Sequence, residues 1–326
     1  MIGNFKANLP YNNFLLLIFG LLIKWSLFLH NPLPIESQQD TFLYRSILHL
    51  VLSINNRFSL FIRIIVFILI YVQAILLNRM VVNQKMFLKP NYLTGMTCLL
   101  FTSLLSGLFV FNAQLLCATI IVAIFSMLSK LSNSSDPKKI LFNTGFIAGI
   151  GAFIYFPSLF FIAVIYLSLF TFRPFRLAES VVLFLGLCMP FYFFYSYLYL
   201  SNQSFQGLFP KLLFYLPVLK FNRPELISLL FLLIIFFIGI YVLQKNMNRL
   251  LVQSRKMWNV IFYFLLISIL ILFVNNQQES LMTNFFIIPI ALISTASFVY
   301  IEKKIAYNFL YWVMVLISAL VGYYNL

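Results

Sequence analysis

Residues 59–77, SLFIRIIVFILIYVQAILL, indicate which kind of fold this chain adopts. The run carries a single charged residue, Arg63, and is otherwise almost entirely apolar on every side of a helix. As a helix it would cross nearly all of the ~30 Å of hydrocarbon in a bilayer, at about 1.5 Å per residue. A membrane β-strand would instead alternate apolar and polar residues over about ten positions. The run therefore predicts a transmembrane helix, in which every backbone group bonds within its own segment.

The rest of the chain has the same character. Of its 326 residues, 63% are hydrophobic and 9% are charged, whereas soluble domains are roughly half apolar and about one quarter charged. We therefore predict an all-α fold, a polytopic transmembrane bundle that forms one integral membrane domain over residues 1–326, with about eleven spans. The expected spans are 13–29, 59–77, 91–110, 112–130, 140–155, 157–172, 178–199, 225–243, 258–274, 281–300 and 306–323.

Two details of these spans affect the packing that we expect. Residues 140–155 and 157–172 are short and meet at Pro157, so they form either a tight hairpin or one long broken helix. Gly145 and Gly149 have the GxxxG spacing in an apolar segment, which allows a neighbouring helix to approach closely.

The basic residues indicate how the chain is oriented. The net charge of +15 is spread over short connections rather than gathered in one patch, so a nucleic-acid partner is not expected. Most of the 22 Lys and Arg residues fall on one side if the N-terminus is cytoplasmic. Because cytoplasmic connections are enriched in Lys and Arg, we predict a bacterial inner-membrane protein with a cytoplasmic N-terminus and a periplasmic C-terminus. No small-residue cleavage site follows the first run, so we expect it to stay as an anchor.

Two connections on the predicted external face are long, 30–58 and 200–224. In the first, apolar residues recur at near-helical spacing over 41–53, which predicts a helix that lies on the outer leaflet. The second is apolar, is interrupted by prolines and is too short to span the bilayer. We expect it to form a re-entrant or surface-lying loop.

Two of the chain's 7 acidic residues, Glu36 and Asp40, stand in the first external loop. At a membrane surface, a carboxylate can take a proton from an acceptor hydroxyl or hold a divalent metal ion, so both are candidate catalytic residues. Asp40 is the preferred candidate of the two, because it precedes the expected surface helix, where an N-cap position would hold it rigidly. Capping alone, or an ordinary solvated loop, would explain the same residues. The 3 cysteines lie in apolar runs without CxxC spacing, so neither a disulfide nor a zinc site is expected.

Cations in and beside the two loops form a second candidate group. They stand on the face where Lys and Arg are normally scarce, which suggests that they bind something negative. The phosphate or pyrophosphate of a polyprenyl lipid fits, because Arg offers forked donors to phosphate oxygens and Lys a point charge. Snorkelling to ordinary phospholipid headgroups is the alternative. The residues concerned are Lys24, Arg45, Arg57 and Arg63 around the first loop, and Lys211, Lys220 and Arg223 in the second.

Three stretches carry a resemblance to known proteins: TFLYRSIL (41–48), QAILLNRMVVNQKMFLKPNYLTGM (73–96) and FNTGFIAGIGAFIYFPSLFFIAVIYLSLFTFRPFRLAE (142–179). They resemble an uncharacterised family of bacterial multi-pass inner-membrane proteins, which brings no established activity. More loosely, an acidic first external loop followed by a membrane-surface helix and a long series of spans looks like the architecture of the GT-C glycosyltransferases.

The GT-C resemblance implies a chemistry. It implies transfer of a sugar from a polyprenyl-phosphate donor, with Asp40 or Glu36 as the base. Arg45, Arg57 and Arg223 would hold the lipid phosphate as the leaving group. The chain departs from that class because three residues separate its two loop carboxylates, where the class has paired acids or a DxD motif. A second departure from that class is that we expect no C-terminal soluble domain.

Two other classes of function stay open. A lipid flippase or transporter would also bind membrane lipids, and a non-catalytic subunit of an envelope assembly would use the bundle as a scaffold for protein partners that the sequence does not identify. Ion-coupled transporters usually place charges or broken helices at mid-membrane. Here polar residues inside the expected spans are few and stand mostly near the span ends, which disfavours ion-coupled transport. They are Gln73, Asn112, Gln114 and Asn143.

Overall fold

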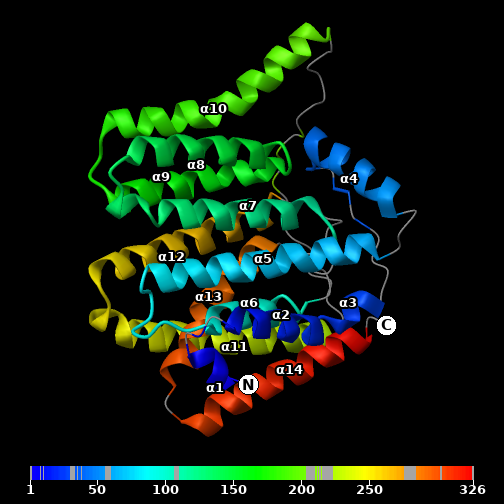
Figure 1. Ribbon diagram of the computed structural model, residues 1–326, viewed down its shortest axis with the longest axis vertical. Coiled ribbons are helices and arrows are strands. Elements are labelled where there is room, and N and C mark those ends of the chain that lie inside the picture. The colour runs from blue at the N-terminus through cyan, green and yellow to red at the C-terminus, as the bar shows by residue number, and fades with distance from the viewer. Residues whose placement is uncertain are drawn as a thin grey trace.

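The computed structural model shows a bundle of helices that lie roughly side by side (Figure 1). Within the described residues the protein is all-helical, and an isolated β-bridge joins Asp40 to Tyr155. The predicted all-α fold is therefore confirmed. The structure describes the whole chain except residues 1, 8, 10, 30–33, 35, 38, 56–59, 106–109, 203–209, 211, 213, 215–222, 275–283, 302 and 325–326.

Helices occupy the segments that the apolar runs predicted, and their lengths differ widely. Four of the described helices are long and apolar enough to cross a membrane, namely α5, α10, α11 with the 3-10 turn that follows it, and α12. The other apolar helices are shorter. Together they fit a membrane protein. The helices are α1 (Ile2–Lys6), α2 (Asn12–Ile23), α3 (Trp25–Leu29), α4 (Phe42–Asn55), α5 (Phe61–Asn83), α6 (Leu93–Phe101), α7 (Ala113–Leu128), α8 (Pro137–Ala152), α9 (Phe161–Phe172), α10 (Leu177–Leu200), α11 (Arg223–Asn246), α12 (Val252–Leu272), α13 (Asn284–Tyr300) and α14 (Lys304–Tyr324).

The segment expected to span at 91–110 is not one continuous helix. Its helix α6 has 9 residues, which rise only ~14 Å, and all of them are buried. The irregular residues after it, 102–105, are buried as well. Backbone outside a helix is tolerated at such depth only where protein covers it and its polar groups are bonded. Here the backbone N–H groups of Thr102, Ser103 and Leu104 donate to carbonyls of the last turn of α6, at 3.1, 3.0 and 3.3 Å.

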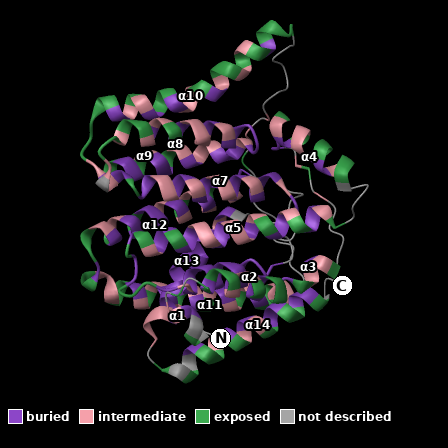
Figure 2. Cartoon of the chain, viewed as in Figure 1, coloured by how far each residue is buried: buried purple, intermediate pink, exposed green. Residues whose placement is uncertain are grey.

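The helices α6 and α13 form the centre of the bundle. Figure 2 shows buried residues gathered in these helices, and in α13 they run from Phe285 to Phe298 without an exposed side chain. The two helices contact each other through hydroxyls as well as apolar groups, because Thr97 Oγ1 lies 2.7 Å from Thr295 Oγ1. A helix that other helices cover on every side is expected to be hydrophobic all round, and the sequence of α13 has this character.

The helices α8 and α10 pack with their backbones in contact. A Cβ atom built on Gly145 would lie 2.4 Å from the Leu183 carbonyl oxygen, and one on Gly186 would lie 2.3 Å from the Phe142 carbonyl oxygen. Only glycine fits at such distances. The glycine spacing thus predicted a close neighbour correctly, and the structure identifies that neighbour as α10.

The two short segments that meet at Pro157 form a hairpin. The helix α8 ends at Ala152, and a short turn leads into the 3-10 helix η3 (Phe156–Phe160) and then into α9. The helices α8 and α9 lie side by side (Figure 1). Of the two arrangements that the sequence allowed, the single broken helix is therefore wrong.

Candidate functional site

The end of the acidic loop is attached to the turn between α8 and η3. Thr41 N–H donates to the Ile154 carbonyl at 3.4 Å, and Phe156 N–H donates to the Gln39 carbonyl at 3.3 Å. The Thr41 hydroxyl also donates to the Phe153 carbonyl. These bonds hold the loop and the start of α4 at one end of the bundle, beside α7 and α8 (Figure 1). Sequence reasoning missed this attachment, because more than a hundred positions separate the partners.

Asp40 is rigid because its carboxylate closes a local turn. The side chain is buried, and it accepts hydrogen bonds from Ser37 N–H at 2.7 Å and from the Ser37 hydroxyl at 2.9 Å. Ser37 was not among the predicted site residues, although a Ser three positions before an Asp is typical of such side-chain turns. The observed bonds give Asp40 a role in holding the loop, next to any role in chemistry.

Glu36 lies in a different environment from Asp40. Its Oε1 atom lies 2.9 Å from Nε of Arg45, and each side chain is 51% exposed. The pair joins the loop to α4, since Arg45 belongs to the first turn of that helix. Of the two candidate carboxylates, Glu36 is therefore the one that a bound molecule can reach.

Two of the other predicted cations, Lys24 and Arg63, are buried in the bundle. Lys24 is fully buried at the junction of α2 and α3, so it does not snorkel along the protein surface to headgroups. Arg63 is 9% exposed and donates from Nη1 to the Phe28 carbonyl at the end of α3. Arg223 begins α11 and is exposed. The remaining predictions, Arg57, Lys211 and Lys220, fall outside the described residues.

Metal ligands are the last predicted feature. Among the residues that the structure describes, no three His, Cys, Asp or Glu side chains are grouped to hold a metal ion. Cys98 and Cys117 are buried and Cys188 is partly buried, all as free thiols. A divalent metal bound with help from the loop carboxylates stays a prediction.

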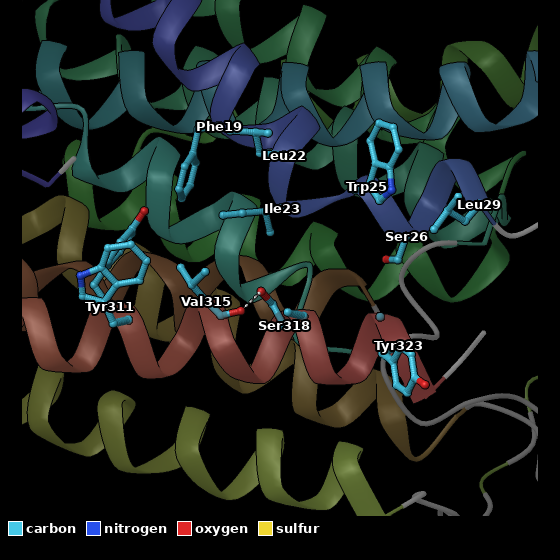
Figure 3. Close-up of a pocket in the computed structure, with 13 residues that line it drawn as sticks. Phe19, Leu22, Ile23, Trp25, Ser26, Leu29, Tyr311, Val315, Ser318 and Tyr323 are labelled. Carbon is cyan, nitrogen blue, oxygen red and sulfur yellow. Dashed lines mark hydrogen bonds between the residues drawn. The ribbon is translucent and has the colours of Figure 1, made fainter.

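A groove that the sequence did not predict lies between α2 and α3 on one side and α14 on the other. We call it the α2–α14 groove. It has a volume of about 520 Å³, and Figure 3 shows the side chains of α2 and α3 along one wall and those of α14 along the other. Its walls are almost entirely apolar or aromatic. The lining residues are Phe19, Leu22, Ile23, Trp25, Ser26, Leu29, Tyr311, Trp312, Val315, Ser318, Ala319, Gly322 and Tyr323.

Two contacts between the walls mark the two ends of the groove. At one end the rings of Phe19 and Tyr311 are stacked, with centroids 6.1 Å apart. At the other end α3 and α14 touch, because a Cβ on Gly322 would lie 2.9 Å from Cβ of Ser26. Between these contacts the groove follows about three turns of α14.

The break at Lys24 shapes the first wall of the groove. The helix α2 ends at Ile23, and Lys24 N–H bonds back to the Gly20 carbonyl at 2.9 Å. The short helix α3 then turns away from the α2 axis (Figure 1). Arg63 holds the far end of α3 through its bond to Phe28. Lys24 inside the 13–29 run was a signal for this break, since a charged residue within an apolar span is rare and marks a special position.

The groove and the Glu36–Arg45 pair lie at the same end of the bundle. The helices α3 and α4 and the C-terminal end of α14 all lie there (Figure 1). A long apolar molecule in the α2–α14 groove would therefore place one of its ends on the face of the protein that carries the exposed carboxylate.

The chain has no match among protein-family models, curated proteins or solved structures. Its function is therefore inferred from the geometry of this chain alone. That geometry provides an apolar groove between α2, α3 and α14, which belong to the shorter apolar part of the bundle. It also provides an exposed pair of opposite charges on the loop and helix at one end of the bundle.

Proposed function

We propose that this protein is a multi-pass inner-membrane protein that transfers a sugar from a polyprenyl-phosphate donor at the external face, as GT-C glycosyltransferases do. The observation that carries the proposal is the α2–α14 groove, which is suited to a hydrocarbon chain and ends on the face that carries Glu36 and Arg45. Membrane lipids then surround the protein and also supply its sugar donor.

The groove has the properties of a site for a lipid chain. Its volume of about 520 Å³ lies within the ~300–1,000 Å³ of ordinary ligand pockets, which are lined mostly by apolar and aromatic groups. Trp25 and Tyr323, at the end of the groove that lies at the same end of the bundle as α4, are exposed. Because Trp and Tyr favour the headgroup level of a bilayer, they support placing the polar end of the lipid there.

The charged pair has the groups that sugar transfer needs. The Arg45 guanidinium is suited to the phosphate of the donor, with two N–H groups directed at its oxygens. The acceptor hydroxyl attacks the anomeric carbon of the sugar while the bond from that carbon to the phosphate oxygen breaks. The lipid phosphate leaves with the electron pair, and Glu36 takes the hydroxyl proton. The Glu36–Arg45 contact must open for this, which costs little for an exposed pair.

The orientation can be tested with reporters. A periplasm-active reporter fused after Ser37 or Asn202 should be active, whereas one fused after Asn83 or Lys139 should be inactive, since the positive-inside rule puts the latter two in the cytoplasm. Reporter activity after each truncation, with fusion protein levels measured by immunoblot, is the readout. The opposite pattern would place Glu36 in the cytoplasm and overturn the proposal.

A donor-binding experiment tests the groove directly. We expect Ala319→Trp to weaken binding of a synthetic polyprenyl phosphate at least about tenfold, or ~1.4 kcal/mol, because the new ring fills the groove. Ala319 is exposed, so the variant should fold. Native mass spectrometry of the purified protein at several lipid concentrations measures the affinity.

Leu320→Trp is the matched control for this experiment. Leu320 is the next residue of α14, is also exposed, and does not line the groove. The Leu320→Trp variant introduces the same side chain into the same helix and should leave the affinity for the polyprenyl phosphate unchanged. Equal affinities of both variants and the unaltered protein would show that the donor chain binds elsewhere.

A lipid flippase is the second candidate, because it would use the same groove without the carboxylate. The two functions differ in what they require of Glu36. Sugar transfer needs its carboxylate as a base, whereas lipid movement between leaflets does not. A variant without that carboxylate therefore separates them.

A further inference from the structure

A second cavity lies at the end of α5 that is remote from α4. It has a volume of about 370 Å³ and is formed by the C-terminal turn of α5 and the segment that leads to α6. This end of the bundle is opposite the face that carries Glu36 (Figure 1). The lining residues are Val81, Val82, Lys85, Phe87, Leu88, Lys89, Pro90 and Asn91.

The segment around this cavity is held in place by α12. The Ser254 hydroxyl donates to the carbonyls of Gln84 and Lys85, at 2.9 and 2.8 Å. The Trp258 indole N–H donates to the Met86 carbonyl at 3.2 Å. Lys85 has a φ of 48°, in the left-handed region that residues other than glycine rarely adopt. The bonds from α12 explain how the segment keeps this conformation.

The charged residues that line the cavity, Lys85 and Lys89, are both positive. Lys85 and Lys89 are both exposed, and neither forms an ion pair with a described residue. The sequence has no acidic residue between Asp40 and Asp136, so no carboxylate stands nearby along the chain. Arg255, beside the Ser254 that holds the segment, is exposed and adds to the positive potential. The cavity therefore attracts an anion.

The rest of the lining is apolar. Val81, Val82 and Phe87 line the cavity, and Leu88 is 53% exposed beside Lys89. A cavity lined by two lysines and by apolar side chains matches a molecule that has a phosphate attached to a hydrocarbon part. Basic pockets at the ends of membrane helices bind lipid headgroups in this way.

We propose that this cavity binds the phosphate headgroup of an anionic phospholipid, with Lys85 and Lys89 as the phosphate ligands. The site is separate from the α2–α14 groove and does not depend on sugar transfer. In the orientation proposed above, it takes its lipid from the cytoplasmic leaflet, which is the leaflet richer in anionic headgroups.

The test uses the full-length protein in detergent and a short-chain phosphatidylglycerol as the probe. Replacing both lysines, Lys85→Gln with Lys89→Gln, should weaken binding about ten- to thirtyfold, since each nearby cation adds to the attraction. The matched control is Lys138→Gln with Lys139→Gln, which removes the same charge from two exposed lysines on α8. The control should bind like the unaltered protein. An equal loss in both double variants would show a general charge effect and overturn the site.

Further arms separate the lipid from a free anion and from misfolding. A short-chain phosphatidylcholine should bind at least tenfold more weakly than phosphatidylglycerol, and inorganic phosphate should compete only at much higher concentration. If inorganic phosphate binds as tightly as the lipid, the site is one for a free anion and the proposal fails. Lys89→Gln alone, which leaves the strained Lys85 in place, should show part of the loss. Ala319→Trp should show none, which separates this site from the groove.

Discussion

Gly186→Val should prevent α8 and α10 from packing and leave little folded protein. A Cβ at this position would lie 2.3 Å from the Phe142 carbonyl oxygen, which is a backbone atom and cannot rotate away. Adding atoms to a packed interior costs about 1–3 kcal/mol, and more where the obstacle is backbone. Valine adds three carbons. The fraction of monodisperse protein after heating, measured by size-exclusion chromatography in detergent, should fall steeply.

Gly151→Ala is the control for this prediction. Gly151 lies on α8, the helix whose backbone Gly186 contacts. A Cβ on Gly151 would be 3.6 Å from the Ser158 hydroxyl oxygen, which is ordinary van der Waals contact. This variant should keep the unfolding temperature of the unaltered protein. A similar loss of folded protein in both variants would mean that these helices are sensitive to any added volume, not to the close contact between their backbones.

Glu36→Gln should strongly slow sugar transfer while the protein stays folded. The removed carboxylate is 51% exposed, and exposed ion pairs such as the one with Arg45 contribute only ~0–1 kcal/mol to stability. A general base contributes typically about 10²- to 10⁴-fold to the rate. Transfer from a synthetic polyprenyl-phosphate sugar in proteoliposomes should therefore fall by that factor, with an unchanged unfolding temperature.

Asp40→Asn should instead act mainly on the stability of the protein and less on sugar transfer. Its carboxylate is buried and accepts two hydrogen bonds from Ser37, and an amide nitrogen cannot accept one of them. A buried group left without its partner costs about 1–3 kcal/mol, so the unfolding temperature should fall.

If Glu36→Gln transfers sugar at the normal rate, the role of Glu36 as the base is excluded. A lipid-scrambling assay on the same proteoliposomes then tests the flippase.

Much of the fold was predictable because the signal for a membrane helix is local. A helix bonds each N–H to a carbonyl four positions earlier, so an apolar run contains all that its backbone requires. The helices α5 and α12 therefore lie where the runs predicted. The 91–110 segment was harder to predict, because α6 ends after 9 residues and the irregular backbone of 102–105 is covered by surrounding helices. Its composition cannot distinguish a span from a buried half-helix.

The candidate site was predictable only in part. The sequence drew attention to Glu36 and Asp40 because acidic residues are scarce, but it ranked Asp40 first as the more rigidly held. The structure places Asp40 in the interior and Glu36 at the surface beside Arg45. Exposure depends on which distant segment covers a residue. For Asp40 that segment is the turn after α8.

Residue type and order were enough to show an apolar, all-helical chain with an unusual acidic loop, since each of these properties belongs to neighbouring residues. The α2–α14 groove, the burial of Lys24 and the bond from Arg63 to Phe28 are different. Each depends on residues from separate helices meeting in space, and the walls of the groove come from opposite ends of the chain. Their positions result from how the helices pack, and packing is set by the fit of whole surfaces that no single stretch of sequence contains.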